Sequence, residues 1–227
     1  MVGRIIETAA DVAEGAAFLA RTDPRLAAAL AQTGPLPLRR QPDGFAALLS
    51  AIISQQVSTA AAAAIRARLV ALGGTDPAGL LRLDDAALRS CGLSRSKVLH
   101  ARGLAESGLD FAALRQLPDA GVVAALTRLP GVGVWTAEVY AIVSLGRADV
   151  FAAGDLALQA AAARLFGLER RPGEAALRAR ALAWSPWRAV AARLLWAHYR
   201  IAGRQDGTRL TPSDHASRSP VDSTRAG

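Results

Sequence analysis

The sequence of 227 residues contains one cysteine, Cys91, and one lysine, Lys97. A single cysteine excludes a disulfide within the chain, a four-cysteine zinc site and an iron–sulfur cluster held by four cysteines of this chain. The three histidines are scattered over positions 100, 198 and 215, without the spacing of a metal site. We therefore expect no iron–sulfur or other redox cofactor.

Long hydrophobic runs are missing as well. No apolar stretch approaches the roughly 18 residues that a membrane helix needs, and the first twenty residues carry Glu7, Asp11 and Glu14, unlike a secretory signal peptide. Alternating β-branched runs are also absent, whereas alanine, leucine and arginine dominate. This composition predicts an all-α protein with no membrane partner, located in the cytoplasm.

The charge is strongly basic. There are 27 Lys and Arg residues against 19 Asp and Glu, which gives a formal charge of +8 and a pI near 11.1. This balance favours a polyanionic partner, with nucleic acid ahead of an acidic membrane surface. The arginines that are candidates to line a duplex stand at positions 39, 40, 66, 68, 95 and 102.

Helical patterns cover most of the chain. Asp43 is expected to cap a helix that starts at Phe45, and a last helix is expected after Ser185-Pro186, with the proline in its first turn, ending near Ala202. Five residues of the first of these helices recur with helical spacing and are expected to share a buried face: Phe45, Leu48, Leu49, Ile52 and Ile53.

Composition changes near the C-terminus. The polar and small residues of 204–227 predict a disordered tail.

One loop between two predicted helices is unusually rich in glycine, the sequence LPGVG from Leu129 to Gly133. Glycine is needed where the backbone takes a positive φ or where another chain comes close. The loop leads into a helix N-terminus, whose N–H groups bind a phosphate without a basic side chain. An ordinary turn between two helices, with no ligand, is the competing interpretation. The flanking Leu-Pro and the following Trp135-Thr136-Ala137 favour the phosphate site.

Four segments together carry a family resemblance. LPGVGVWTAEVYA resembles the helix-hairpin-helix of base-excision DNA glycosylases of the helix-hairpin-helix–GPD superfamily, and Asp155, twenty residues after Trp135, matches the essential aspartate of that family. AIISQQVSTAAAAAI resembles the helix with the DNA-wedging residue. WSPWRAVAARLLW resembles the closing helix of the AlkA-type 3-methyladenine DNA glycosylase II group. The match covers roughly residues 36–202 and implies a two-lobed helical fold with the active site in the cleft between the lobes. Residues 45–148 would form one lobe, and the N-terminal segment 1–44 would pack with residues 149–203 to form the other.

The resemblance also implies an activity. The partner would be double-stranded DNA with a damaged base, and the reaction would extrude an alkylated purine of the 3-methyladenine or 7-methylguanine type and hydrolyse its glycosidic bond. The carboxylate of Asp155 would stabilise positive charge on the sugar, although a plain helix cap is an alternative role and both can hold. Strand-cutting relatives use a hairpin lysine where this chain has Trp135, so we expect a monofunctional enzyme with water as nucleophile.

By the same resemblance, Trp135 is expected to form a wall of the substrate pocket and Trp196 to lie in the pocket against Asp155, while Val139 and Leu156 replace two pocket aromatics beside Tyr140. Trp184 and Trp187 are expected to pack in the core. Gln56 stands at the wedge position, where the AlkA type has leucine. The expected DNA contacts are Gln55, Gln56, Gly131, Gly133, Val134 and Thr136. The expected ligands of a monovalent cation, Na⁺ or K⁺, are the backbone carbonyls of Thr127, Leu129 and Val132.

Two other functions stay open at this point. One is a glycosylase for another lesion, such as uracil, hypoxanthine or an oxidised base. The other is a non-catalytic DNA-binding module, because hairpins of this kind also occur as plain phosphate-binding units. Release of a base from methylated duplex would distinguish an enzyme from a module. We expect a monomer in either case.

Overall fold

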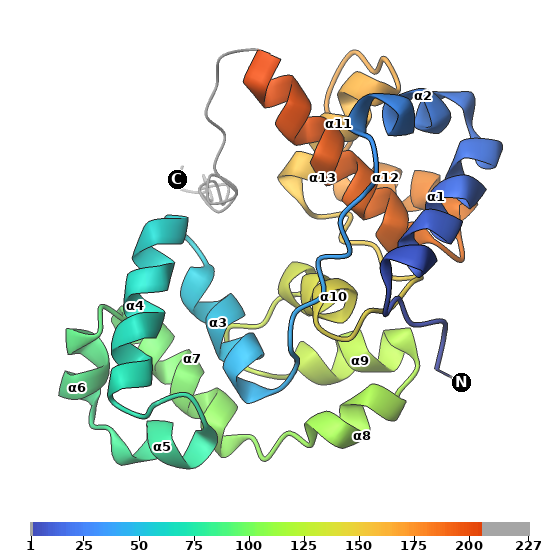
Figure 1. Cartoon of the computed structure of the whole chain (residues 1–227). Coiled ribbons are helices and arrows are strands. Elements are labelled where there is room, and N and C mark those ends of the chain that lie inside the picture. The colour runs from blue at the N-terminus through green and yellow to red at the C-terminus, as the bar shows by residue number, and fades with distance from the viewer. Residues whose placement is uncertain (1, 206–227) are drawn as a thin grey trace, which may run out of the picture.

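The computed structural model describes residues 2–205, and over this range the fold is all-α apart from one isolated bridge between Ile5 and Arg147. Figure 1 shows the helices and their order along the chain. Their bounds are α1 (Ala9–Thr22), α2 (Pro24–Thr33), α3 (Phe45–Ser54), α4 (Thr59–Ala71), α5 (Pro77–Arg82), α6 (Asp85–Ser90), α7 (Arg95–Glu106), α8 (Phe111–Gln116), α9 (Asp119–Leu126), α10 (Val134–Val143), α11 (Leu156–Leu165), α12 (Glu174–Ala181), the short 3₁₀ helix η1 (Leu182–Trp184) and α13 (Arg188–Gln205).

The helices gather into two lobes (Figure 1). In one lobe α3 packs on α4 and α7, and α5 and α6 pack on α7. In the other, α13 packs on α1, α2 and α11, so helices from the two ends of the described chain share one core. The boundaries at residues 45, 149 and 204 stay predictions. The last helix continues to Gln205, past its predicted end, and residues 206–227 of the predicted tail lie outside the described residues.

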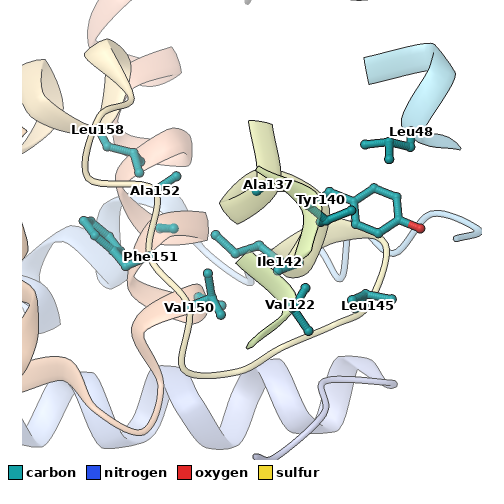
Figure 2. Packing of buried hydrophobic residues seen from close by; sticks show 14 of the residues in the cluster. Leu48, Val122, Ala137, Tyr140, Ile142, Leu145, Val150, Phe151, Ala152 and Leu158 are labelled. Carbon is teal, nitrogen blue, oxygen red and sulfur yellow. The ribbon is translucent and has the colours of Figure 1, made fainter. Parts of the chain in front are cut away.

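Helix α10 lies near the centre of the molecule and contacts both α9 and α3. Figure 2 shows Ile142 of this helix toward Val122 of α9 and Phe151 of the following loop, with Leu158 of α11 further to the same side and Leu48 of α3 on the other side of the helix. These five side chains are at most 3% exposed. A helix covered from several sides must be apolar around much of its circumference, which explains the sequence VWTAEVYAIV. The loop that precedes α10 is therefore attached to a helix that is enclosed on several sides.

A buried arginine ties the connector between α2 and α3, residues 34–44, to both α10 and α13. Arg193 is 1% exposed, and its guanidinium donates to the carbonyls of Leu38 (3.1 Å), Ala189 (2.9 Å) and Ile142 (3.4 Å). Burial lowers the pKa of Arg193 to about 10. Because all three acceptors are main-chain oxygens, this side chain fixes the path of the connector across the two lobes.

The predicted start of α3 is correct, but the predicted cap is wrong. Gly44 is the N-cap residue, and its N–H donates to the hydroxyl oxygen of Tyr140 at 2.8 Å. Asp43 instead forms an ion pair with Arg115, with 2.6 Å between Oδ2 and Nε. A bidentate guanidinium partner competes with the helix terminus for the same carboxylate. The predicted buried face of α3 is confirmed for Phe45, Leu48, Leu49, Ile52 and Ile53.

The predicted start of the last helix is displaced. Helix α13 begins at Arg188, so Pro186 precedes the helix and does not occupy its first turn. The N–H of Trp187 donates to the carbonyl of Trp184 at 2.7 Å, which closes a turn around the cis Ser185-Pro186 bond. The expected packing of the two tryptophans is confirmed, because Trp184 and Trp187 are 2% and 4% exposed.

Candidate active site

The carboxylate of Asp155 is held by four N–H groups. Its Oδ1 accepts from the backbone of Ala157 (2.8 Å) and Leu158 (3.1 Å), so Asp155 is the N-cap of α11. Its Oδ2 accepts from the indole Nε1 of Trp135 (3.1 Å) and of Trp196 (3.4 Å). The helix-cap role is therefore confirmed, and the second oxygen is held by two tryptophans from different helices.

The loop before Asp155 is fixed by hydrogen bonds to its backbone carbonyls. The N–H of Asp155 donates to the carbonyl of Ala152 at 2.9 Å, and Gln159 Nε2 donates to the carbonyl of Ala153 at 2.9 Å. A Cβ on Gly154 would lie 3.2 Å from the carboxylate of Glu174, so the loop has little room for a side chain. The sequence AAGD thus places the acid in one orientation.

Asp155 opens into a cleft of about 880 Å³. Four of the five predicted pocket residues line it, and they come from α10 and α13: Trp135, Val139, Tyr140 and Trp196. The fifth, Leu156, is half-buried and is not among the residues that line the cleft. Gln55 and Thr136, predicted as DNA contacts, line the cleft as well.

Tyr140 lines the cleft and connects its wall to the start of α3. The residue is 2% exposed, and its hydroxyl oxygen accepts the N–H of Gly44 at the start of α3. Burial raises the pKa of Tyr140 to about 12. The phenol is therefore neutral, and it links α10 to the first turn of α3.

The turn between α3 and α4, residues 55–58, lies beside the cleft, and a side chain of α7 binds the backbone where the turn begins. Lys97 of α7 donates from Nζ to the carbonyls of Ile53 and Gln55, both at 2.6 Å, and burial lowers the pKa of Lys97. Gln56, the predicted wedge, is exposed with a φ of +57°. The lone lysine of the sequence thus supports the backbone just before the predicted wedge, a role that sequence reasoning missed.

Gln55 joins the same turn to the hairpin. Its Nε2 donates to the carbonyl of Gly131 (3.0 Å) and to Oγ1 of Thr136 (3.2 Å). Thr136 is only 5% exposed, so its hydroxyl faces Gln55 in the interior of the cleft. The amide side chain predicted to touch DNA therefore also joins two segments that are predicted to contact DNA.

The hairpin consists of α9, the loop 127–133 and α10. Gly131 has a φ of +79°, and a Cβ there would lie 2.3 Å from Nδ1 of His100. Gly133 is the N-cap of α10 without a side-chain cap bond, and space around it is open. Val134 and Trp135 follow at 47% and 40% exposure. The hairpin thus presents the uncapped N-terminus of α10 at the surface, a geometry that binds phosphate.

The residues expected to hold a cation lie in this loop. The carbonyl of Leu129 accepts the N–H of Val132 at 3.2 Å, and Thr127 donates from Oγ1 to the carbonyl of Val123 at 2.9 Å. Within residues 2–205, no group of three or more His, Cys, Asp or Glu side chains is placed to hold a metal ion. No helix in the same range is long and apolar enough to cross a membrane.

The cleft is basic except for its one carboxylate. Among the described residues that line it, Asp155 is the acid, and the arginines are Arg39, Arg40, Arg66 and Arg200. Another buried acid of this region, Glu138 of α10, does not line the cleft and pairs with Arg178 at 2.7 Å. Burial raises the pKa of Glu138, with Arg178 opposing the shift.

A two-lobed helical fold with a hairpin beside a cleft that holds a fixed carboxylate is the architecture of a helix-hairpin-helix DNA repair protein. The chain belongs to the HhH-GPD superfamily of base excision DNA repair proteins, whose family model matches residues 49–188. The matched segment includes the α3–α4 turn, the hairpin and Asp155.

Known relatives agree with this assignment. The chain is 36% identical to the DNA-3-methyladenine glycosidase of Bacillus halodurans, whose crystal structure superposes with a TM-score of 0.75 over 82% of this chain and 89% of that one. It is 26% identical to the 3-methyladenine DNA glycosylase Mag1 of Schizosaccharomyces pombe, solved with abasic DNA, with a TM-score of 0.71 over 81% and 95% of the two chains. It is also 26% identical over 190 residues to the alkylbase DNA glycosidase-like protein mag2 of S. pombe, covering 78% of this chain and 89% of that protein.

Proposed function

We propose that this protein is a monofunctional DNA N-glycosylase that extrudes an alkylated purine from duplex DNA and hydrolyses its glycosidic bond, leaving an abasic site. The observation that carries the proposal is the carboxylate of Asp155, oriented by four N–H donors at a cleft large enough for a base. Family membership and the similarity to 3-methyladenine glycosylases support the choice of substrate.

The chemistry follows from the fixed carboxylate. As the bond between C1′ and the base nitrogen breaks, positive charge develops on the sugar. A carboxylate that is already oriented stabilises that charge without reorganising during the reaction. Both oxygens of Asp155 are held, so in our proposal this side chain acts by its charge and by orienting the attacking water.

The position of Lys97 favours water, and not a lysine amine, as the nucleophile. A Schiff base requires a free amine in reach of C1′, and Lys97 Nζ is engaged with two main-chain carbonyls at 2.6 Å and is not among the residues that line the cleft. Trapping of a covalent DNA adduct with borohydride would contradict this part of the proposal.

DNA would be held by three groups. The amides at Gly133 and Val134 would bind a backbone phosphate, Arg40, Arg66 and Arg200 of the cleft would neutralise its neighbours, and Gln56 would fill the gap left by the extruded base. The backbone carbonyls of Thr127, Leu129 and Val132 would hold an alkali cation, which would supply positive charge near that phosphate. The protein would act as a monomer in the cytoplasm.

Replacement of the carboxylate tests the proposal. Asp155→Asn keeps the size of the side chain but removes its charge and replaces one accepting oxygen by a donating NH2 group, so we expect base release to fall by about a thousandfold. Binding to an abasic-site duplex should persist, because the hairpin and the arginines are unchanged. The measurement is single-turnover release of 7-methylguanine and 3-methyladenine from methylated duplex, beside a binding titration.

The alternative functions predict other results. Near-wild-type release by Asp155→Asn would remove Asp155 from the chemistry. Binding of damaged duplex by the wild-type protein without release of any base would indicate a DNA-binding module.

A further inference from the structure

Arg39 occupies an unusual place in the cleft wall. It belongs to the connector 34–44 and lines the cleft together with Asp155. Its φ is +50°, in the left-handed region that non-glycine residues rarely adopt. Side chains held on such a backbone concentrate at functional sites.

The guanidinium of Arg39 lies near the indole that holds Asp155. Its Cζ is 6.0 Å from the ring centroid of Trp196, and the indole of Trp196 in turn donates to Asp155. No hydrogen bond or ion pair of the Arg39 side chain is found within residues 2–205. Its neighbours in the cleft wall differ, because Arg40 donates to the carbonyl of Ser144 and Arg66 donates to Ser54 Oγ. Arg39 thus carries an unused fork of donors beside the acid.

We propose that Arg39 is a specificity-determining residue whose guanidinium binds the acceptor edge of a neutral 6-oxopurine and thereby shifts the selectivity of the cleft toward such bases and away from the cationic alkylated purines that the cleft also accepts. The proposal rests on the proposed function, because it concerns the base that enters the same cleft. It adds a ranking of substrates that the family assignment does not contain.

The chemistry of the two base classes gives the ranking. Hypoxanthine is neutral and presents O6 and N7 as adjacent acceptors, the pair that an arginine fork binds in a bidentate manner. In 7-methylguanine N7 carries the methyl group and the ring is positively charged. It can accept only at O6, and a guanidinium in the cleft repels its charge. Arg39 also lies over the ring of Trp196, where a cationic base would otherwise find an attractive aromatic face.

The experiment compares release of hypoxanthine and of 7-methylguanine from otherwise identical duplexes under single-turnover conditions. For Arg39→Gln we expect hypoxanthine release to fall about tenfold, as for loss of a bidentate contact, and 7-methylguanine release to rise. Arg39→Lys keeps the charge but loses the fork, so hypoxanthine release should fall while 7-methylguanine release does not rise. Arg66→Gln is the matched control: it removes a cleft charge elsewhere and should change both rates by the same factor.

Each other outcome overturns the proposal. If Arg39→Gln lowers both rates by one factor and flattens the salt dependence of binding, Arg39 contacts a phosphate. If neither rate changes, Arg39 has no role in base recognition. Thermal melting of each variant identifies loss of fold, and Arg39→Lys still tests the proposal if Arg39→Gln is unstable. Failure of the wild-type protein to release either base would instead contradict the proposed function.

Discussion

Lys97 is the residue whose chemistry differs most from its surroundings, since every other basic side chain except the histidines is arginine. Its compact ammonium group reaches two carbonyls at the end of α3, Ile53 and Gln55, which a helix C-terminus leaves without partners. A cation at this end also complements the helix dipole. The residue that follows is Gln56, the proposed wedge, so Lys97 positions the turn that would enter the DNA.

Substitution Lys97→Met should therefore impair extrusion more than chemistry. It keeps the apolar length of the side chain and removes the donors, and we expect about a tenfold slower release of a damaged base that is paired in duplex, given the strength of bonds to a charged donor. A damaged base that is mispaired with the base opposite is already partly unstacked, so its extrusion depends less on the turn that Lys97 positions.

The paired and mismatched substrates form the control. A smaller defect on the mismatched duplex supports a positioning role for Lys97. An equal defect on both duplexes, with a lowered melting temperature, would reduce Lys97 to a structural cap.

The sequence was sufficient to single out Asp155 as the candidate acid, because its distance from the hairpin matches the family resemblance, whereas its place before an apolar helix alone indicates a helix cap. It could not reveal the bonds that Gln55 makes to Gly131 and Thr136, or those of Lys97, because these contacts join segments far apart in the chain. Sequence reasoning weighed Trp135 as a pocket wall and did not foresee its bond to Asp155.

At the scale of elements, two glycines of the hairpin are expected to have different roles: Gly131 contributes to stability and Gly133 to binding. Gly131→Ala should lower the free energy of unfolding by about 2 kcal/mol, because its positive φ strains alanine and its Cβ would collide with the ring of His100. Gly133→Ala should fold normally, since its φ is −82° and its Cβ meets nothing within 4 Å. Urea unfolding measures both.

Binding to abasic-site duplex completes the comparison. If the α10 terminus holds a phosphate, Gly133→Ala should weaken binding at unchanged stability, because the added methyl group lies where the phosphate approaches. Unchanged affinity would indicate that this loop is an ordinary turn between helices with no bound phosphate.

Helix ends were predictable where a local residue supplies the cap. The sequence predicts a short helix that Asp84 begins and Gly92 ends, and a next helix capped by Ser94 or Ser96. In the structure Asp84 and Ser94 are the N-caps of α6 and α7, and Gly92 follows α6 with a φ of +99°. The prediction failed at Asp43, where Arg115 from a distant helix takes the carboxylate. Local chemistry therefore decides a boundary only when no partner from elsewhere in the fold competes.

At the scale of the whole molecule, the excess of positive charge predicts steep salt dependence. The logarithm of DNA affinity should fall linearly with the logarithm of salt concentration, because phosphate contacts release counterions. Arg66→Gln, in the cleft wall, should reduce that slope by about one if Arg66 contacts a phosphate.

The titration run in potassium chloride and in tetramethylammonium chloride at equal ionic strength also tests the proposed hairpin cation, since only the smaller ion fits between carbonyls.

The two tryptophans that share one oxygen of Asp155 come from different helices, α10 and α13, and both line the cleft. A movement that separates these two helices would stretch at least one of the two indole–carboxylate bonds. The proposed catalytic acid thus depends on the spacing of α10 and α13, and a base large enough to increase that spacing would loosen the group that has to act on it.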